Sequence, residues 1–205
     1  MTDKVSGEKE LFISFQGVTL RAYDRIVFPN TDWAYSAHQH WAIHGANGSG
    51  KSILVRAIYG QVPAVEGRII HHFLEKRAAG PDATPEKRPQ DFIAMVGFEQ
   101  QKTILKRQTQ FYQARWHSSE SAASLSVSDY LLFQHVKRID NFRTDDRAVN
   151  VDKFLARQAD IADLLSIGPL LEKKIVQLSN GEIRKVVLAR ALLKRPCLLI
   201  LENPL

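Results

Sequence analysis

The sequence predicts an α/β fold in which strands at both ends of the chain flank a helical middle. Three observations lead to this prediction: apolar runs with turn residues near the N-terminus, a glycine-rich loop between a strand-like and a helix-like segment, and a final apolar run that ends in a carboxylate. The 205 residues, 44% of them hydrophobic and 24% charged, have the composition of a globular domain. We therefore expect one α/β domain that carries a helical insertion.

Two short strands are predicted at the N-terminus. Residues 11–15 form the first apolar run and are followed by Gly17. Residues 18–20 begin the next run, which leads toward residues 26–28 and stops before Pro29-Asn30.

A third strand is predicted at Trp41-Ala42-Ile43, directly before the glycine-rich loop. The loop leads into a helix that we expect to end near Gly60. Residues 67–73 and 92–98 predict two more short strands. Between them, residues 78–89 contain three prolines and a glycine and predict a loop.

The second half of the chain predicts helices and one last strand. Ser128-Asp129 before an apolar run indicates one helix start, and residues 151–165 have helical spacing that Gly168-Pro169 ends. A further helix follows the motif LSNGE at residues 178–182, and residues 197–201 predict the final strand.

Composition and charge exclude several classes of protein. One cysteine excludes a disulfide framework and a multi-cysteine metal site. The apolar runs are too short to span a membrane, and the first ten residues have no signal-peptide pattern. We therefore expect the protein to be located in the cytoplasm. A net charge of +6 suits an anionic partner. Because the sequence ends directly after a strand and a proline, we expect a truncated chain.

The glycine-rich loop matches the phosphate-binding pattern G-x-x-x-x-G-K-[ST]. Its residues are Gly45, Ala46, Asn47, Gly48, Ser49, Gly50, Lys51 and Ser52. Glycines allow the backbone N–H groups to converge, and the start of the following helix adds positive potential. Lys51 can reach the β- and γ-phosphate oxygens and Ser52 can bind magnesium, so the loop predicts nucleotide binding.

The motif LSNGE allows two interpretations. Ser179 as N-cap with Glu182 three residues later is the pattern of a capping box, which needs no ligand. Ser179, Gly181 and the helix start would equally form a second anion-binding surface. Both interpretations can hold together.

With the phosphate loop, LSNGE resembles the signature LSGGQ of the ATP-binding cassette (ABC) ATPases. Asn180 stands for the first glycine and Glu182 for the glutamine. The resemblance covers residues 11–70, 92–101 and 160–204, and within the family it is similar to ModF-like cassettes of molybdate transport. It implies a P-loop NTPase core with an N-terminal antiparallel β-subdomain and an inserted helical subdomain.

The resemblance also divides the chain. Residues 1–99 would form the β-subdomain and phosphate-loop core, 100–177 the helical subdomain, and 178–205 the signature helix and the acidic strand, within one ABC-type domain whose C-terminal part is missing.

Further ligand contacts follow from the resemblance. Gln100, with Gln101 as the alternative, would be the glutamine that contacts magnesium and the attacking water. Tyr23, between two strands and ahead of the phosphate loop, would stack on adenine, with Trp33 and Tyr35 as alternatives; a buried core role suits Tyr23 equally well.

The segment CLLILENP resembles the family's acidic Walker B strand, with two departures. Glu202 stands where the family has the magnesium-binding aspartate, and it would still hold the ion at the sheet's carboxyl edge. Asn203 stands where the family has the catalytic glutamate. An amide can orient water but cannot take its proton.

Three functions are compatible with the sequence. The first is a Mg-ATP-dependent ATPase that closes as a pair of cassettes, in a homodimer or a tandem chain, and acts with a membrane transporter subunit at the inner face of the plasma membrane. The second is a nucleotide switch with slow hydrolysis. The third is an ABC-F-like nucleic-acid or ribosome partner, which we expect less. Its sparse candidate residues are Lys102, Lys106, Arg107, Arg115 and Trp116.

Overall fold

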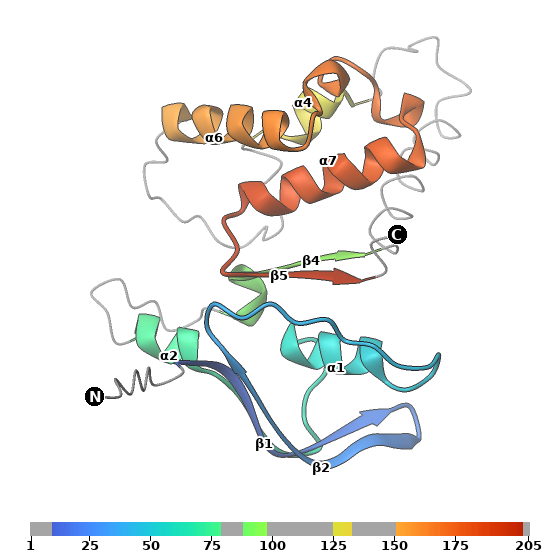
Figure 1. The fold of residues 1–205 in the computed structure, drawn as a ribbon, viewed down its shortest axis with the longest axis vertical. Helices are drawn as coiled ribbons and strands as arrows, with labels where there is room; N and C mark the ends of the chain where they lie inside the picture. The colour runs from blue at the N-terminus through green and yellow to red at the C-terminus, as the bar shows by residue number, and fades with distance from the viewer. Residues whose placement is uncertain (1–9, 79–87, 98–124, 133–150, 203–205) are drawn as a thin grey trace, which may run out of the picture. The chain divides into compact units, whose positions relative to one another are not determined.

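A computed structural model describes residues 10–78, 88–97, 125–132 and 151–202 (Figure 1). The chain divides into two compact units, Met1–Ile93 and Ala94–Leu205, here named the N-terminal and the C-terminal unit. The three-part division expected from the sequence stays a prediction.

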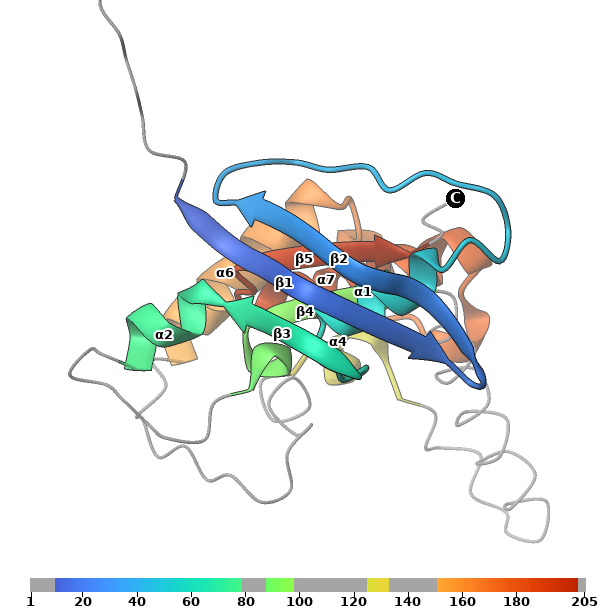
Figure 2. The same ribbon diagram turned by 90° about the horizontal axis from the view of Figure 1, so that it is seen from below.

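An antiparallel sheet with the order β2-β1-β3 forms the N-terminal unit's framework (Figure 2). Its strands are β1 (Leu11–Ala22), β2 (Arg25–Ser36) and β3 (Glu66–His71). The predicted break after residue 15 is wrong, because β1 continues through Gly17. Gly17 has φ 57°, and the register with β2 shifts between Phe15 and Val18, so the glycine forms an irregularity within one long strand.

The predicted end of the second strand before Pro29-Asn30 is also wrong. β2 runs through both residues as far as Ser36. Proline is tolerated here because β2 is at the edge of the described sheet, where a missing N–H breaks no ladder hydrogen bond on the open side.

Helices follow the phosphate loop and β3. α1 (Lys51–Ile58) is the helix predicted to end near Gly60. The strand predicted over residues 67–73 ends at His71, because α2 (His72–Ala78) begins there. The short helix η1 (Pro89–Asp91) precedes the C-terminal unit.

The predicted strand Trp41-Ala42-Ile43 is wrong. Neither of the two described sheets includes these residues, so the described strands offer them no backbone ladder. Trp41 is 52% exposed; its Nε1 donates to Gln39 Oε1 at 3.1 Å, and its ring contacts Trp33. Side-chain contacts therefore hold this segment in an irregular conformation.

Two neighbouring strands, β4 (Ile93–Gly97) and β5 (Leu198–Glu202), run in the same direction in Figure 1, and apart from Ile93 they belong to the C-terminal unit. Its helices are α4 (Val127–Tyr130), α6 (Val151–Leu164) and α7 (Asn180–Leu193). The short helices η2 (Gly168–Leu170) and η3 (Ile175–Gln177) connect α6 to α7. α4 begins one residue before the predicted Ser128-Asp129, because Ser126 caps it.

One apolar core holds this unit together. α7 lies between α6 and the strands β4 and β5 in Figure 1, and all contribute apolar side chains to one cluster. Buried members include Val96, Ile161, Ile183 and Val186. Because α7 is apolar on several sides, the core fixes the position of its start at Ser179. Within the described ranges, no helix combines the length and the apolar character that a bilayer crossing requires.

Candidate functional site

The phosphate loop ends in a left-handed glycine at the start of α1. Gly50 is the N-cap with φ 94°, and among the described residues no side chain caps this helix start. Lys51 Nζ donates to the carbonyl oxygens of Gly45 at 2.8 Å and Ala46 at 2.9 Å, and Ser49 N donates to Ala46 O at 3.2 Å. The ammonium group is therefore held over the loop, beside the helix start.

Close packing against β2 fixes this end of the loop. A Cβ added to Gly50 would lie 2.3 Å from Val27 Cγ1 and 2.8 Å from Phe28 Cε2. Only glycine satisfies both this packing and the positive φ. The phosphate loop therefore rests on the strand that follows the β1–β2 turn.

Tyr23 lies in that turn. Its φ is 54° and its side chain is 99% exposed, so the alternative of a buried core tyrosine is wrong. Val27, which packs against Gly50, lies only four residues further along β2. Tyr23 is thus an accessible aromatic ring on the hairpin that supports the loop.

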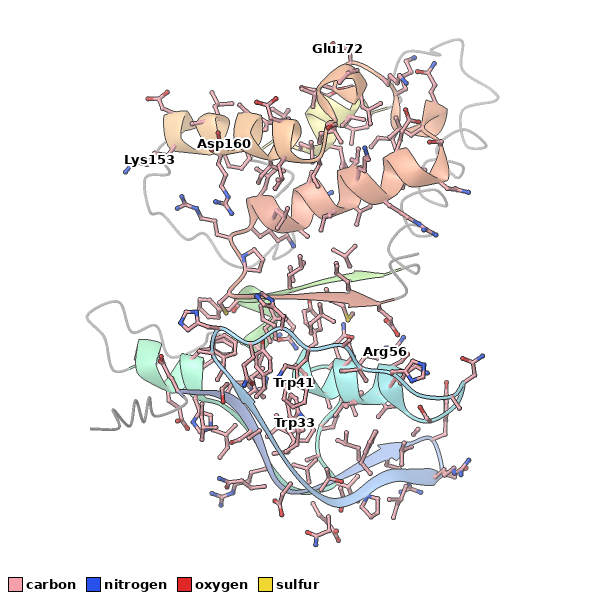
Figure 3. The ribbon with its side chains drawn as sticks, in the orientation of Figure 1. Trp33, Trp41, Arg56, Lys153, Asp160 and Glu172 are labelled. Carbon is pink, nitrogen blue, oxygen red and sulfur yellow. The ribbon has the colours of Figure 1, made fainter. Side chains whose placement is uncertain are left out.

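Trp33 and Tyr35, the alternatives to Tyr23, already have aromatic neighbours. Trp33 contacts Phe15 at 5.3 Å and Trp41 at 5.5 Å between ring centroids. It also stacks on Tyr35 at 6.2 Å, and Figure 3 shows Trp33 and Trp41 beside one another. Tyr35 Oη donates to Gln39 O at 2.6 Å, and burial raises the pKa of Tyr35. These contacts favour Tyr23 as the ring available to a ligand.

The opposite end of α1 is fixed by side chains. His71 Nε2 is 2.8 Å from Ile58 O and donates to it in the matching tautomer, and Gln90 Nε2 donates to Gly60 O at 2.7 Å. Burial lowers the pKa of His71 and so favours the neutral form of its ring. The last turn of α1 is therefore anchored to β3 and η1.

The predicted capping box at the start of α7 is confirmed. Ser179 Oγ accepts from Glu182 N at 3.3 Å, and Glu182 Oε2 accepts from Ser179 N at 2.7 Å. Lys173 Nζ donates to Glu182 Oε1 at 3.1 Å. The hydrogen bonds from Ser179, and next that from Lys173, lower the pKa of Glu182 to about 2. A Cβ added to Gly181 would meet no described atom within 4 Å, so the backbone there is open to approach.

Glu202 ends β5 beside the end of β4. A Cβ added to Gly97 would lie 3.4 Å from Glu202 Cβ and 3.6 Å from Glu202 Oε2. The glycine thus leaves room for the carboxylate at this edge.

The predicted residues form two groups. Gly45 to Ser52 and Tyr23 belong to the N-terminal unit, and Ser179, Gly181 and Glu202 belong to the C-terminal unit. Gln100, Gln101, Asn203 and the candidate basic residues between 102 and 116 lie outside the described residues. No three His, Cys, Asp or Glu side chains in the described part of the chain form a metal-binding group.

Sequence reasoning missed Lys173 and Gly97. Lys173 lies nine residues before Glu182, outside the motif LSNGE, and resembles any surface lysine, so no sequence signal identifies it. Gly97 directly precedes the segment Phe98-Glu99-Gln100, and its position at the end of a predicted strand was the available signal.

Comparison with known proteins places both groups, except Tyr23, within the range that one family model matches. Residues 28–205 match the model described as "ABC transporter". The chain is 32% identical to the Escherichia coli molybdenum import ATP-binding protein ModC over 166 residues, 80% of this chain and 37% of that protein. It is 27% identical to E. coli ModF over 187 residues, which cover 91% of this chain and 31% of ModF. The chain is 30% identical to Pyrococcus abyssi WtpC over 171 residues, which cover 81% of this chain and 38% of WtpC.

The chain spans only about a third of the length of these three relatives. Solved cassettes have the same fold. CbiO1 from Clostridium perfringens superposes with a TM-score of 0.61 at 19% identity, covering 94% of this chain and 65% of CbiO1. A nucleotide-free ATP-binding cassette superposes with a TM-score of 0.62 at 16% identity, covering 95% of this chain and 70% of that cassette. The predicted fold class, a P-loop NTPase core with an antiparallel β-sheet, is confirmed.

Proposed function

Because the chain belongs to the ABC transporter family of ATP-binding domains, we propose that it binds Mg-ATP at Gly45 to Ser52 and hydrolyses it. Domains of this family are ATPases. The observation that carries the proposal is the start of α1, where Lys51 and a helix start without a described side-chain cap adjoin one loop. Such a start holds backbone N–H groups toward an anion, and the lysine adds the charge that triphosphate requires.

Tyr23 would hold the other end of the nucleotide. Its exposed ring lies on the hairpin whose second strand supports Gly50. Stacking of adenine on an aromatic ring is worth about 1–3 kcal/mol per base. Base and triphosphate would then contact the same compact unit.

Three positions are predicted to bind magnesium, and the structure describes two of them, Ser52 and Glu202, each of which carries side-chain oxygen. Ser52 is the second residue of α1 and is exposed, and Glu202 ends β5. Hydroxyl and carboxylate oxygens are ligands that Mg²⁺ accepts together with phosphate oxygens, so these residues fit the ion. We propose Ser52, Glu202 and Gln100 as its protein contacts; when bound, the ion would neutralise charge on the β- and γ-phosphates.

Ser179 and Gly181 would contact the γ-phosphate on a second cassette. The open backbone at Gly181 supports this role, and the capping box fixes the helix start that would approach. The second cassette would come from another copy or from a tandem domain. Relatives are named for import of molybdenum, molybdate or tungstate, and zinc, which supports a transport-linked role beside a membrane subunit at the cytoplasmic face.

Asn203 favours a second candidate function, a nucleotide switch with slow turnover. Lys51, Ser52 and Glu202 would still bind and orient Mg-ATP, but an amide next to the water accepts no proton. Positioned general-base catalysis contributes roughly 10²–10⁴-fold in rate. We therefore expect this site to hydrolyse ATP more slowly than a site with a catalytic glutamate, although it would bind Mg-ATP as well.

Asn203→Glu tests both candidates in the full-length protein. We expect ATP turnover to rise by roughly 10²–10⁴-fold, with ATP affinity by calorimetry little changed. Asn203→Gln is the matched control, since it lengthens the side chain without adding a base, and it should give no gain. Equal turnover in the unaltered protein and Asn203→Glu, with no second cassette supplying it, would contradict slow hydrolysis at this site.

A further inference from the structure

The start of α7 carries a negative charge that a neutral signature lacks. Glu182 is the third residue of the helix, and its carboxylate bonds to the N-cap amide of Ser179 at 2.7 Å. This placement suits the helix itself, since an acidic residue in the first turn complements the helix dipole. It opposes the proposed function, because the same surface would have to approach a γ-phosphate.

Lys173 is placed to cancel that charge. Its Nζ is 3.1 Å from Glu182 Oε1, while the other carboxylate oxygen faces the Ser179 amide. The ammonium therefore balances the carboxylate without competing for the helix cap. The side chains of Lys173 and Glu182 are 46% and 27% exposed. The ion pair therefore lies at the protein surface, where a second cassette could cover it.

The backbone of Lys173 is held independently of this ion pair. Its N–H donates to Leu170 O at 2.9 Å, and its carbonyl accepts from Val127 N at 3.0 Å. Ser128 N also donates to Leu171 O at 2.9 Å, so the start of α4 binds this turn twice. Lys173 is thus held in place before any nucleotide or second cassette arrives.

We propose that Lys173 is a positioning residue that neutralises Glu182 and thereby allows the start of α7 to close over a nucleotide on a second cassette. This inference rests on the proposed pairing of cassettes. A Lys173 without this role would be an ordinary surface lysine, whose ion pair contributes little to stability. The two roles differ in what happens when Glu182 also loses its charge.

The test uses the full-length protein with the non-hydrolysable analogue AMP-PNP and magnesium. Closure is measured as the AMP-PNP concentration that gives half-maximal compaction or association in sedimentation velocity, and ATP turnover is measured in parallel. Lys173→Ala should raise that concentration roughly 10-fold or more and lower turnover, because an uncompensated like charge at an interface is costly. Lys174→Ala, which removes the neighbouring positive charge, should change it less than about twofold.

Rescue by a second substitution separates charge from structure. In Glu182→Gln, removal of Lys173 should no longer matter, so the double variant should close as readily as Glu182→Gln alone. The melting temperature should change by less than about 4 °C in Lys173→Ala, as expected for one surface pair in a chain of this size.

Each outcome decides between the ideas. If the unaltered protein closes with AMP-PNP and Lys173→Ala closes equally well, the role of Lys173 is refuted and the pairing stands. If Lys174→Ala is as damaging as Lys173→Ala, or Glu182→Gln fails to rescue, a specific neutralising role is refuted as well. If the unaltered protein binds AMP-PNP but never closes, the pairing itself is refuted, and the inference with it.

Discussion

The starts of helices α1 and α7 differ in whether a side chain caps their backbone N–H groups. α1 begins after a glycine with φ 94°, and its described surroundings provide no side-chain cap. α7 begins with a reciprocal capping box between Ser179 and Glu182, reinforced by Lys173. Both helix starts would contact phosphate in the proposed function. Of the two, only the start of α7 has a side-chain cap among the described residues.

This difference separates a binding site from a closing surface. An uncapped start next to a lysine gains most from a ligand that brings negative charge. A capped start is complete without ligand, so its contact with a phosphate adds to a structure that already exists. We therefore expect nucleotide to stabilise the N-terminal unit first, with α7 contributing only to closure.

The largest expected effect comes from Lys51→Ala. It removes the ammonium held over the loop, and we expect ATP affinity to fall roughly 30-fold or more, as for loss of one partner in a close charge pair. Isothermal titration calorimetry measures this. Arg56→Ala is the matched control, because Arg56 is an exposed cation on α1 outside the loop (Figure 3). An equal loss of ATP affinity in both variants would show that positive charge in general, and not the position of Lys51 in the loop, determines ATP binding.

Alanine at the two helix-start glycines should have opposite effects. Gly50→Ala combines a positive φ with a Cβ 2.3 Å from Val27 Cγ1, and we expect about 2–4 kcal/mol of destabilisation. Gly181→Ala adds a Cβ that meets no described atom within 4 Å inside a helix, and it should be neutral or stabilising by up to about 1 kcal/mol. Thermal melts of both variants measure the effects, and destabilisation of similar size would contradict the contrast.

A smaller loss is expected for Ser179→Ala, about 1 kcal/mol of stability from the lost N-cap. Ser126→Ala is its control, since Ser126 and Asp129 form the same capping box at α4. Denaturant unfolding should give similar losses for both variants, whereas ATP turnover should fall further in Ser179→Ala. If turnover falls equally, the start of α7 has no role beyond stability.

The smallest effect is a dependence of stability on acid. The pKa of Glu182 is lowered to about 2, so its contribution is complete above the ordinary glutamate pKa and is lost as the pH falls from about 4.5 toward 2. Glu182→Gln should flatten this part of the stability–pH curve. Unfolding free energies of both proteins across that interval measure the difference, and parallel curves would refute it.

Local sequence signals predicted the helix starts and missed the length of the strands. The pattern Ser179 to Glu182 predicts a capping box because both partners lie within one turn, and the structure has it. Gly17 and Pro29 were interpreted as strand ends, but β1 absorbs the glycine as an irregularity and β2 tolerates proline at an edge. Pairing with a distant strand decides both cases, and a single sequence does not reveal it.

Candidate site residues follow from the sequence where one motif contains them. The loop from Gly45 to Ser52 is contiguous, so its pattern alone proposes Lys51 as a phosphate-binding residue. Support from outside the motif was not predictable: the packing of Val27 on Gly50 and the bond from Lys173 to Glu182 join separate segments. The apolar run at Trp41 misled because its contacts are ring packing rather than a backbone ladder.

The anchored end of α1 has a consequence for hydrogen exchange. His71 and Gln90 bind the carbonyls of Ile58 and Gly60 from other elements, whereas the hydrogen bonds of Lys51 to Gly45 and Ala46 stay within the loop at the other end, which packs on β2. Local opening should therefore begin at the loop and stop near Ile58, so that amide protection rises along the helix in that direction. Bound nucleotide would remove this gradient by slowing exchange at Lys51 and Ser52, while the last turn would keep the protection it already has.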